Sequence, residues 1–322
     1  MEENNKGLVY VGKIIELDRI PDADFIVSAT VVCGQGGKWR GVVRSADFSI
    51  GDKCIVFLPD SLVQESDDMA FLKSSGWRVK MRRFRRAPSE VVIMPNKFNL
   101  LVGNDVTFLC GVTKYCKPVP ACLNGLAKGL FPDFIPKTDE PNYQRPDANV
   151  AELIGKPFYV SLKMDGSSTT AFKHNGEFGV CSRNLELKKD ENNGYWKVAQ
   201  KYKLEEKLPD ETALQWETCG PGIQSNPMGL SDLEGYAFSA YNIVEKRYFT
   251  MKETIDLCEK IDFPMAEILR EGDCFSNYGI EVLGEGTYDN HKQREGVVVR
   301  SQENLLGHKP ISFKVINLNY EK

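Results

Sequence analysis

The sequence predicts a two-domain α+β protein, in which a small β-barrel or sandwich precedes an antiparallel sheet domain with a few helices. Three observations support this prediction. The chain has 322 residues, which allows two domains at about 150 residues each. Short segments rich in valine, isoleucine and aromatic residues fill the first third of the chain. Six of the 16 prolines then fall between Pro118 and Pro146, where the composition changes.

The N-terminal segments have the length and composition of β-strands. Turn residues separate them, among them Pro21-Asp22, the glycine-rich stretch 34–37 and Gly51-Asp52. Several short strands at this spacing favour a small barrel, because closure of the sheet removes its exposed edges. The expected strands cover residues 8–17, 25–33, 39–44, 54–58, 77–84 and 90–94.

The proline-rich stretch predicts an extended connection between the two domains. Proline lacks an amide donor and fixes φ, so such a stretch is unsuited to a sheet or a long helix. It has room for a short helical turn at 123–130. We therefore expect one domain over 1–112, a linker over 113–149 and a second domain over 150–322.

In the second half, apolar strand-like runs alternate with polar and helical stretches. Strands outnumber helices and follow one another like antiparallel pairs, which favours an α+β domain over a doubly wound sheet. The expected strands cover residues 158–163, 169–173, 177–181, 212–218, 236–244 and 296–300, and the expected helices cover 195–208 and 252–261.

The composition excludes several classes of protein. Hydrophobic residues make up 42% and charged residues 27%, as in an ordinary globular chain. No apolar run approaches the length of about 18 residues that a membrane-spanning helix needs, and the N-terminus lacks the pattern of a secretory signal. The nine cysteines are scattered without a C-x-x-C pair. We therefore expect a reduced intracellular protein, without a disulfide framework or a zinc site.

The charge balance and the charge distribution point in different directions. The net charge of −4 argues mildly against a protein that coats nucleic acid by charge alone. On a strand, however, Arg78, Lys80 and Arg82 would alternate with apolar residues and form one basic face. This face predicts nucleic-acid binding, and the alternative is a solvated edge that discourages aggregation. The basic cluster comprises Arg78, Lys80, Arg82, Arg83, Arg85 and Arg86, with no acid among them.

The clearest chemical signal is Lys163-Met164-Asp165-Gly166, directly after the apolar run 158–162. A lysine at the end of a buried strand is held rigidly and partly desolvated, which lowers its pKa and favours a nucleophilic role. Asp165 can face the same side of an extended chain, and Gly166 lets the backbone turn beside a ligand. Taken alone, the pattern fits a surface lysine before a turn better.

Further motifs follow in a fixed order. Together with the lysine motif, they resemble motifs I, Ia, III, IIIa, IV and V of the covalent nucleotidyltransferase superfamily, which contains polynucleotide ligases and capping enzymes. Segments 217–224 and 312–317 are more similar to RNA ligases than to DNA ligases. The later motifs are Ser182-Arg183-Asn184, Glu217 within 215–222, Phe238 to Asn242, Glu295-Gly296 before an apolar run, and Ser312 to Val315.

The first part of the chain adds to this resemblance. The turn Pro21 to Asp24, the pair Gly51-Asp52 and the segment 77–82 resemble the OB domain of the Naegleria/Deinococcus type of ATP-dependent RNA ligase. In that family an OB domain precedes the nucleotidyltransferase domain. The resemblance therefore implies an OB-type β-barrel followed by an antiparallel-sheet-rich nucleotidyltransferase (adenylation) domain.

The resemblance also implies a mechanism. Lys163 would attack the α-phosphate of ATP and form lysyl-AMP. The AMP would pass to the 5′-phosphate of a nucleic acid, and a 3′-OH would attack that activated phosphate. Asp165, Glu217 and Glu295 would surround Mg²⁺ or Mn²⁺, mostly through water. Lys314 would complete the catalytic set by contacting the phosphates of ATP.

The resemblance assigns the remaining ATP contacts as well. Tyr241 would stack on adenine, with Phe238 as the second choice, and both residues could equally be core aromatics. Arg183 would contact the ribose or the 5′-phosphate of the nucleic acid, and its alternative is a surface arginine on a turn. The expected ATP-binding set comprises Leu162, Lys163, Arg183, Glu217, Phe238, Tyr241, Glu295 and Lys314.

The last motif departs from the family pattern. Motif V often carries two lysines separated by one residue, and here Ile316 stands at the second position. Lys309 or Lys322 could supply the second charge. The chain also ends soon after this motif, so we expect no C-terminal OB domain, and the N-terminal barrel would clamp the substrate.

These inferences lead to one leading hypothesis and two alternatives. The leading hypothesis is a monomeric RNA-repair enzyme, an ATP-dependent RNA ligase that joins 3′-OH and 5′-phosphate ends, with nicked duplexes preferred. One alternative is a GTP-using capping nucleotidyltransferase. The other is a nucleic-acid-binding protein that has lost catalysis, although retention of the candidate catalytic residues speaks against it.

Overall fold

The computed structural model describes residues 6–34, 36–115 and 125–321, and the chain divides into two compact units. The first unit contains residues 1–118 and 143–147, and the second contains 119–142 and 148–322. Part of the predicted linker 113–149 therefore belongs to each unit. No helix in the described ranges is long and apolar enough to cross a membrane.

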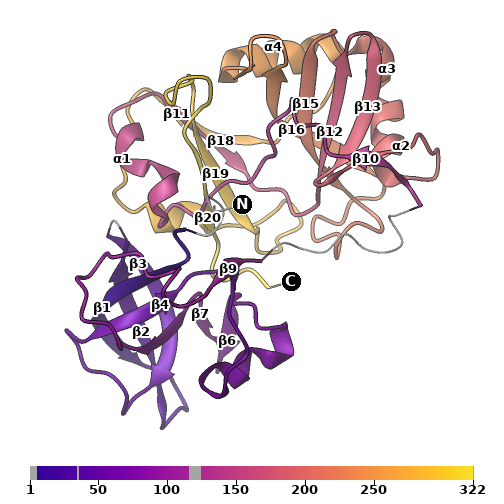
Figure 1. Ribbon diagram of the computed structural model, residues 1–322. Helices are drawn as coiled ribbons and strands as arrows, with labels where there is room; N and C mark the ends of the chain where they lie inside the picture. Colours follow the sequence, from indigo (N-terminus) through magenta and orange to yellow (C-terminus); the bar gives the residue numbers. More distant parts are fainter. Residues whose placement is uncertain (1–5, 35, 116–124, 322) are drawn as a thin grey trace. The chain divides into compact units, whose positions relative to one another are not determined.

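The first unit is built around a five-stranded antiparallel sheet with the order β3-β2-β1-β4-β8 (Figure 1). The sheet curls until its outer strands approach, because the amides of Glu90 and Val91 bond to the carbonyl of Arg40 in β3 at 2.8 and 3.3 Å. Trp39 and Ile14 are fully buried inside it. The strands are β1 (Val9–Arg19), β2 (Ile26–Cys33), β3 (Gly37–Arg44), β4 (Lys53–Phe57) and β8 (Val92–Pro95).

Shorter elements of the first unit lie outside this sheet. Leu72 and Val79 pack with Leu8 and Ile55 in a second apolar cluster. Two short antiparallel pairs, β5 with β9 and β6 with β7, complete the unit. These elements are β5 (Ser61–Leu62), the 3-10 helix η2 (Asp67–Ser75), β6 (Arg82–Phe84), β7 (Ala87–Ser89) and β9 (Thr113–Lys114).

The predicted strand 77–84 is wrong over most of its length. Trp77 has a left-handed φ of 62° and breaks the extended chain. Arg78 forms an isolated bridge with Leu62, and only residues 82–84 pair as a strand, with β7. The basic residues therefore do not line one face of a single strand. The alternation of basic and apolar residues suggested a strand, but it carries no information about the turn at Trp77.

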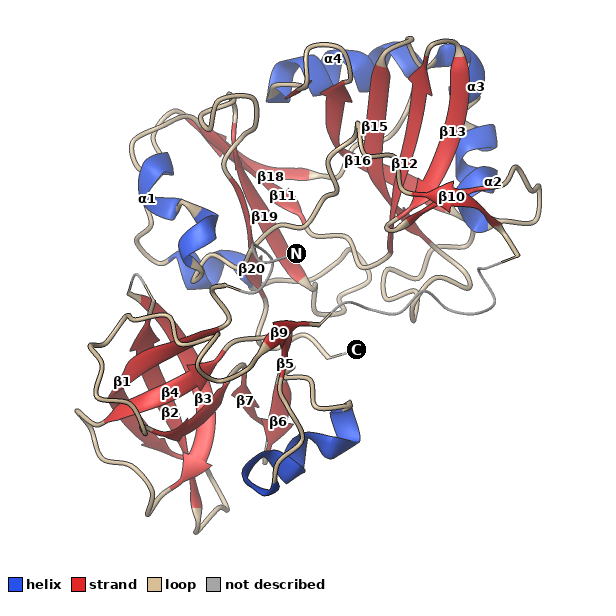
Figure 2. Ribbon diagram, viewed as in Figure 1, coloured by secondary structure: helices blue, strands red, loops and turns tan. Residues whose placement is uncertain are grey.

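The second unit contains two antiparallel sheets (Figure 2). The larger has the order β10-β14-β13-β12-β15-β16-β17 and the smaller has the order β18-β11-β19-β20. The larger sheet consists of β10 (Ala127–Leu130), β12 (Ser167–His174), β13 (Glu177–Ser182), β14 (Leu185–Leu187), β15 (Thr212–Cys219), β16 (Glu234–Asn242) and β17 (Arg247–Tyr248). The smaller consists of β11 (Phe158–Leu162), β18 (Ile268–Gly272), β19 (Gly296–Ser301) and β20 (Ser312–Ile316).

Helices cover one face of the larger sheet. Trp196 and Leu257, from two helices, pack with Trp216 and Leu214 of β15 in one buried cluster. The predicted helix 195–208 is broken at Lys203, which has a left-handed φ of 54°. The helical elements are α1 (Val150–Leu153), α2 (Gly194–Lys201), α3 (Leu204–Lys207) and α4 (Met251–Ile261), with the short 3-10 helices η4 (Pro146–Ala148) and η5 (Ile280–Gly284).

Two expectations for the proline-rich stretch are also wrong. The segment was expected to contain no sheet, yet β9 and β10 pair with β5 and β14. A helical turn was expected at 123–130, yet residues 127–130 form a strand, and 123–124 lie outside the described residues. Neither strand contains a proline, so the composition of the whole stretch misrepresents its short non-proline runs.

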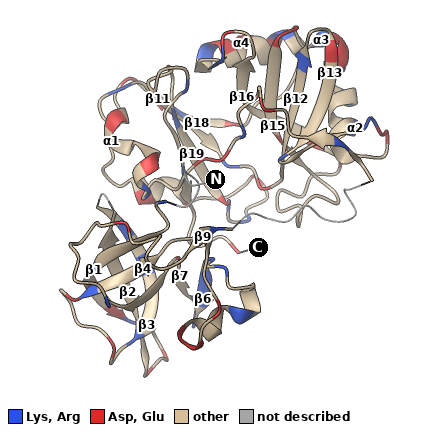
Figure 3. Cartoon of the chain, in the orientation of Figure 1, with Lys and Arg blue, Asp and Glu red and all other residues tan. Residues whose placement is uncertain are grey.

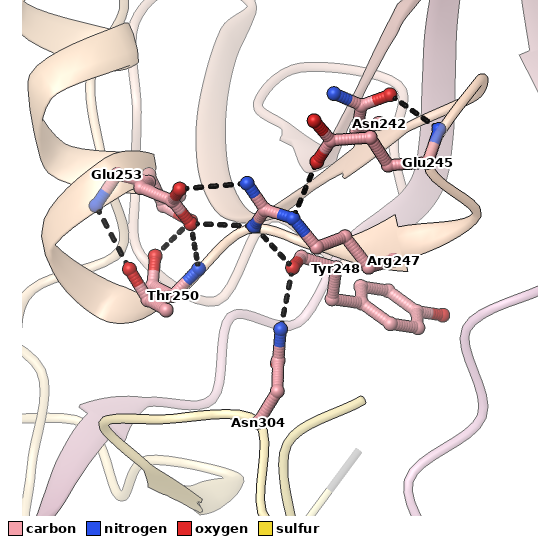
Figure 4. Close-up of polar contacts among 8 residues, drawn as sticks. Asn242, Glu245, Arg247, Tyr248, Thr250, Glu253 and Asn304 are labelled. Carbon is pink, nitrogen blue, oxygen red and sulfur yellow. Dashed lines mark hydrogen bonds and ion pairs between the residues drawn. The ribbon is translucent and has the colours of Figure 1, made fainter. Parts of the chain in front are cut away.

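A polar network joins α4 to the neighbouring strands (Figure 4). The two terminal nitrogens of Arg247 each donate to Glu253 at 2.8 Å. Glu253 also accepts from the amide of Thr250, whose hydroxyl accepts from the amide of Glu253, and this reciprocal capping box starts the helix. The amide of Asn304 donates to the Tyr248 carbonyl at 2.7 Å. The network therefore ties the loop after β19 to β17 and to the start of α4.

Replacing Glu253 by alanine is expected to lower the free energy of unfolding by about 1–2 kcal/mol, because it removes half of the capping box and both bonds to Arg247. The Glu253 side chain is 39% exposed, so screening by water limits this cost. Hydrogen bonds from Arg247 lower the pKa of Glu253 from 4.5 to about 2. The contribution is therefore present above pH 4.5 and is lost as the pH falls towards 2.

Urea unfolding of the wild type and the Glu253→Ala variant at several pH values checks this expectation. Glu259→Ala, at an exposed position of the same helix, serves as the matched control. Equal destabilisation at neutral and acidic pH would contradict the assignment to an ionised carboxylate.

Candidate active site

Lys163 lies just beyond the end of an inner strand of the smaller sheet of the second unit. It directly follows β11, which pairs with β18 on one side and β19 on the other. Its amide bonds to the carbonyl of Gly296 at 3.1 Å. Its Nζ lies 2.8 Å from Glu295 Oε2, and the two side chains are 24% and 17% exposed. Residues separated by 132 positions in the sequence thus form one ion pair.

The glycine of the lysine motif brings the neighbouring strand close. A Cβ added to Gly166 would lie 2.3 Å from the Thr218 carbonyl oxygen and 2.8 Å from Glu217 Cγ. Only glycine therefore permits this approach between the start of β12 and the end of β15. Both elements belong to the larger sheet, so the glycine positions Glu217 beside the lysine motif.

Two tyrosines that the sequence analysis missed support the same motif. The hydroxyl of Tyr320 donates to Oδ2 of Asp165, which is 3% exposed. The hydroxyl of Tyr288 lies 3.4 Å from the carbonyl oxygen of Lys163 and accepts from the amide of Glu295 at 3.2 Å. Neither tyrosine belongs to the recognised motifs, and both lie in irregular segments, so no spacing pattern marks them.

The carboxylates around Lys163 control its protonation. Burial alone would lower the pKa of Lys163, but Glu295 and Glu217 outweigh burial and raise that pKa above its ordinary value. Burial raises the pKa of Glu217 to about 8, although Lys163 opposes the shift. The site thus contains more carboxylate groups than its one ammonium group can neutralise. This excess favours a further cation.

The carboxylates suit a hard divalent cation that keeps most of its waters. No group of three or more His, Cys, Asp or Glu side chains in the described ranges is arranged to bind a metal directly. Asp165, Glu217 and Glu295 nevertheless supply oxygen donors near a lysine, the donor type that Mg²⁺ and Mn²⁺ prefer. Of the nine cysteines, Cys116 and Cys122 lie outside the described residues, and the seven described cysteines are free thiols.

A buried ion pair lies next to this group. The side chain of Arg300 is 4% exposed, and its Nη2 lies 2.6 Å from Glu140 Oε1. Its Nη1 also donates to the Ser161 hydroxyl at 3.3 Å. Burial favours the neutral form of Glu140, but Arg300 outweighs it, and the pKa of Glu140 is lowered. Arg300 follows a buried run of three valines. A positive charge at such a position indicates that the chain also supplies a buried negative partner. Nothing in the sequence identifies Glu140 as that partner.

Residues 136–142, which we call the strap, run along the second unit and contact most of the motifs. Arg183 pairs with Asp139 at 3.2 Å, and the amide of Lys314 bonds to the Pro141 carbonyl at 2.9 Å. The strap also contacts Gln215 through the Pro136 carbonyl at 2.9 Å, Ser168 through Thr138 at 3.3 Å, and Arg300 through Glu140. This part of the predicted linker is therefore a component of the site.

The candidate stacking residues lie in different surroundings. Phe238 is half-buried, and the guanidinium of Arg300 lies 5.4 Å from the centre of its ring. Tyr241 is 8% exposed and packs against Tyr248 with ring centres 5.2 Å apart. Tyr241 thus has the surroundings of a core aromatic residue, whereas Phe238 keeps an accessible surface next to the buried ion pair.

The remaining candidates are on neighbouring elements. Leu162 ends β11 and its amide bonds to the Glu267 carbonyl at 2.8 Å. Lys314 lies in β20, opposite Val298 of β19. Arg183 is 60% exposed at its side chain. Ile316 ends β20, Lys309 is exposed in the loop before that strand, and Lys322 lies outside the described residues.

The basic cluster belongs entirely to the first unit, around β6 (Figure 3). Arg78 donates through Nε to Asp60 at 3.0 Å, and its guanidinium lies 4.1 Å from the centre of the Tyr115 ring. Arg82 donates to the Phe71 carbonyl and the Ser74 hydroxyl. Lys80, Arg85 and Arg86 are exposed. The six residues thus divide into some that hold the unit together and some that face solvent.

Comparison with known proteins covers both units. A family model described as RNA ligase matches residues 156–316, and a model of an OB-fold domain matches residues 8–96. No curated protein matches this chain. The matched ranges contain the motifs quoted above except residue 317, and the first unit is thus an OB fold.

Solved structures give full-length similarity. A Naegleria gruberi RNA ligase structure with PPi is 30% identical, with a TM-score of 0.77, over 97% of this chain and 96% of that chain. A point mutant of the same enzyme with ATP and Mn is 29% identical, with a TM-score of 0.79, over 96% and 97% of the two chains. An apo point mutant is 29% identical, with a TM-score of 0.80, over 98% of both.

Proposed function

This chain belongs to the RNA ligase family, and from that membership we propose that it seals 3′-OH/5′-phosphate nicks in RNA-containing duplexes with ATP. One observation carries the proposal. Lys163 directly follows β11, an inner strand of its sheet, its Nζ lies 2.8 Å from Glu295, and Glu217 is close enough to raise the pKa of Lys163. The related Naegleria gruberi enzyme has been solved with ATP and Mn and with PPi, which supports the same nucleotide here.

The first step is nucleophilic attack by Lys163 on the α-phosphate of ATP. A phosphoramidate bond forms between Nζ and phosphorus, the bond to the β-phosphate oxygen breaks, and pyrophosphate leaves. The ammonium must first lose a proton from Nζ, and the ion pair with Glu295 opposes that loss. Mg²⁺ or Mn²⁺, held mostly through water by Asp165, Glu217 and Glu295, would supply positive charge that competes for these carboxylates.

Two further transfers complete the reaction. A 5′-phosphate oxygen attacks the lysyl-AMP phosphorus, and Lys163 leaves with its bonding electrons and regains a proton. The 3′-OH then attacks the activated 5′-phosphate, and AMP leaves. Lys314 supports these steps as a positive charge near the phosphates. Arg183 contacts the ribose of ATP or the 5′-phosphate of the RNA.

Phe238 is the better candidate for stacking on adenine. A stacking residue needs one accessible ring face, which half-buried Phe238 keeps and buried Tyr241 does not. Leu162 lies directly before the nucleophile and would line the same nucleotide pocket. We therefore rank Phe238 above Tyr241, the reverse of the order that the sequence motif predicts.

Covalent labelling tests the proposed nucleotide. The protein is incubated with α-labelled ATP or GTP in the presence of Mg²⁺ or Mn²⁺, and protein-bound label is measured. We expect label from ATP. Label from GTP alone would favour a capping-type enzyme, and the absence of label from either nucleotide would favour a binding protein without catalysis.

A sealing assay tests the proposed substrate. Nicked duplexes carry RNA or DNA on each side of the nick, and single-stranded ends serve as the comparison. We expect the fastest sealing when the 3′-OH strand is RNA within a duplex. Equal rates with an all-DNA nick would contradict the assignment of RNA as the substrate.

A further inference from the structure

The β6–β7 hairpin of the first unit has an unusual turn. Phe84 pairs with Ala87, so Arg85 and Arg86 form the whole two-residue loop. Their φ angles are 49° and 70°, and a type I′ turn requires positive φ at both positions. Asn-Gly is the sequence that best suits such a turn, because side chains with a bulky Cβ are strained in the left-handed region. Two consecutive arginines are a poor choice for stability.

No contact within the described part of the chain compensates for this strain. Both arginines are exposed, and neither guanidinium takes part in a hydrogen bond or an ion pair among the described residues. The Arg86 carbonyl accepts a bond from Arg83 at 3.1 Å, which is a backbone function that any residue could serve. The two side chains are thus available to a ligand.

The surroundings of the turn indicate the chemistry of that ligand. Phe84, next to the turn, is 41% exposed. Residues 82–89 contain no acid. The Ser89 hydroxyl of β7 accepts from the amide of Val42 in β3 at 3.0 Å, and β3 carries exposed Lys38, Arg40 and Arg44. Positive charge beside an exposed aromatic ring suits a polyanion with stacking groups, as in nucleic acids.

We propose that the turn Arg85-Arg86 is a rigid contact for the phosphate backbone of the RNA substrate, with Phe84 beside it. This inference rests on the proposed function and assigns the backbone contact to two of the six basic residues. The turn fixes the backbone of both arginines on a short hairpin, which is bonded to β3 through Ser89. Arg78 and Arg82 have a structural role, because each is engaged within the unit.

The double variant Arg85→Asn/Arg86→Gly separates binding from stability. The Asn-Gly turn relieves the strain, so the unfolding temperature of the first unit is expected to rise by about 3 °C. Affinity for a nicked RNA duplex is expected to fall by about tenfold. The slope of log affinity against log salt concentration is expected to decrease by about 2, or about one unit per lost phosphate contact. A purely structural turn would show the stability gain alone.

The variant Arg85→Lys/Arg86→Lys is the matched control, because it keeps both charges and the strained turn. It is expected to retain most of the affinity and the full salt slope. Sealing is expressed per adenylylated molecule, so that any change in the first chemical step is removed from the comparison. Wild-type affinity and salt slope in the Asn-Gly variant would overturn the proposal. If the wild type accepts label from ATP but neither binds nor seals RNA nicks, the proposed function fails instead.

Discussion

Replacing Lys163 by alanine is expected to abolish covalent labelling by ATP, with a loss of at least about 1000-fold. The phosphoramidate forms at Nζ, and the described structure places that atom 2.8 Å from Glu295 at the end of β11. No neighbouring amine can substitute, because a shift of even a few ångströms removes the alignment that an in-line displacement requires. Protein-bound label from α-labelled ATP, measured after denaturation, checks the expectation.

Sealing of a nick that already carries AMP on its 5′-phosphate provides the complementary measurement. The final step transfers no group through Lys163, so the alanine variant should retain a measurable part of that activity. Lys173→Ala is the matched control, since Lys173 lies on β12 of the same unit and its Nζ donates to the backbone carbonyl of Glu205 at 3.2 Å. Persistent labelling of Lys163→Ala would show that another residue is the nucleophile.

The sequence predicted that Lys163 and Glu295 belong to one site, but not that they form an ion pair or which groups support them. Lys163 and Glu295 were recognised because each ends or precedes an apolar run, and the ordered motifs indicated that both belong to one site. Tyr320 and Tyr288 carry no such signal, because their hydroxyls reach the motif from irregular segments after β20 and before β19. Such contacts arise from tertiary packing and not from local periodicity.

The same distinction explains the errors in the fold. Strands with clear apolar alternation, such as β2 and β12, were placed within a few residues of their observed bounds. Lys203 and Trp77 each adopt a left-handed φ that interrupts a predicted element. Neither residue type favours that conformation, so no rule based on glycine or asparagine could have located these breaks. The tertiary contacts around each position outweigh its local propensity.

The composition of the proline-rich stretch concealed the strap. Six prolines indicated a linker, and the average composition of the stretch correctly predicted a segment without long helices or strands. It did not show that Glu140, near the end of the stretch, would provide the partner that Arg300 needs. A buried arginine requires a buried acid, but the sequence offers many acids, and only the path of the chain selects one.

Removing one partner of the Glu140–Arg300 pair is expected to destabilise the second unit strongly. Glu140→Ala leaves the guanidinium of Arg300, which is 4% exposed, without its charged partner. Breaking a buried pair on one side costs about 3–5 kcal/mol, because the remaining charge stays desolvated. Native-state hydrogen exchange as a function of urea, followed in peptides from β11 and β19, measures the loss within the second unit.

A double variant tests whether that loss of stability comes from the unpaired buried charge of Arg300. Glu140→Leu/Arg300→Met replaces both partners by apolar side chains of similar length, so no buried charge remains. Its cost is expected to be well below the sum of the two single changes, since the desolvation penalty disappears with both charges. Strict additivity would contradict this account. Covalent labelling by ATP is measured on the same variant. If it recovers stability but labels slowly, the Glu140–Arg300 pair also positions the residues around it for catalysis.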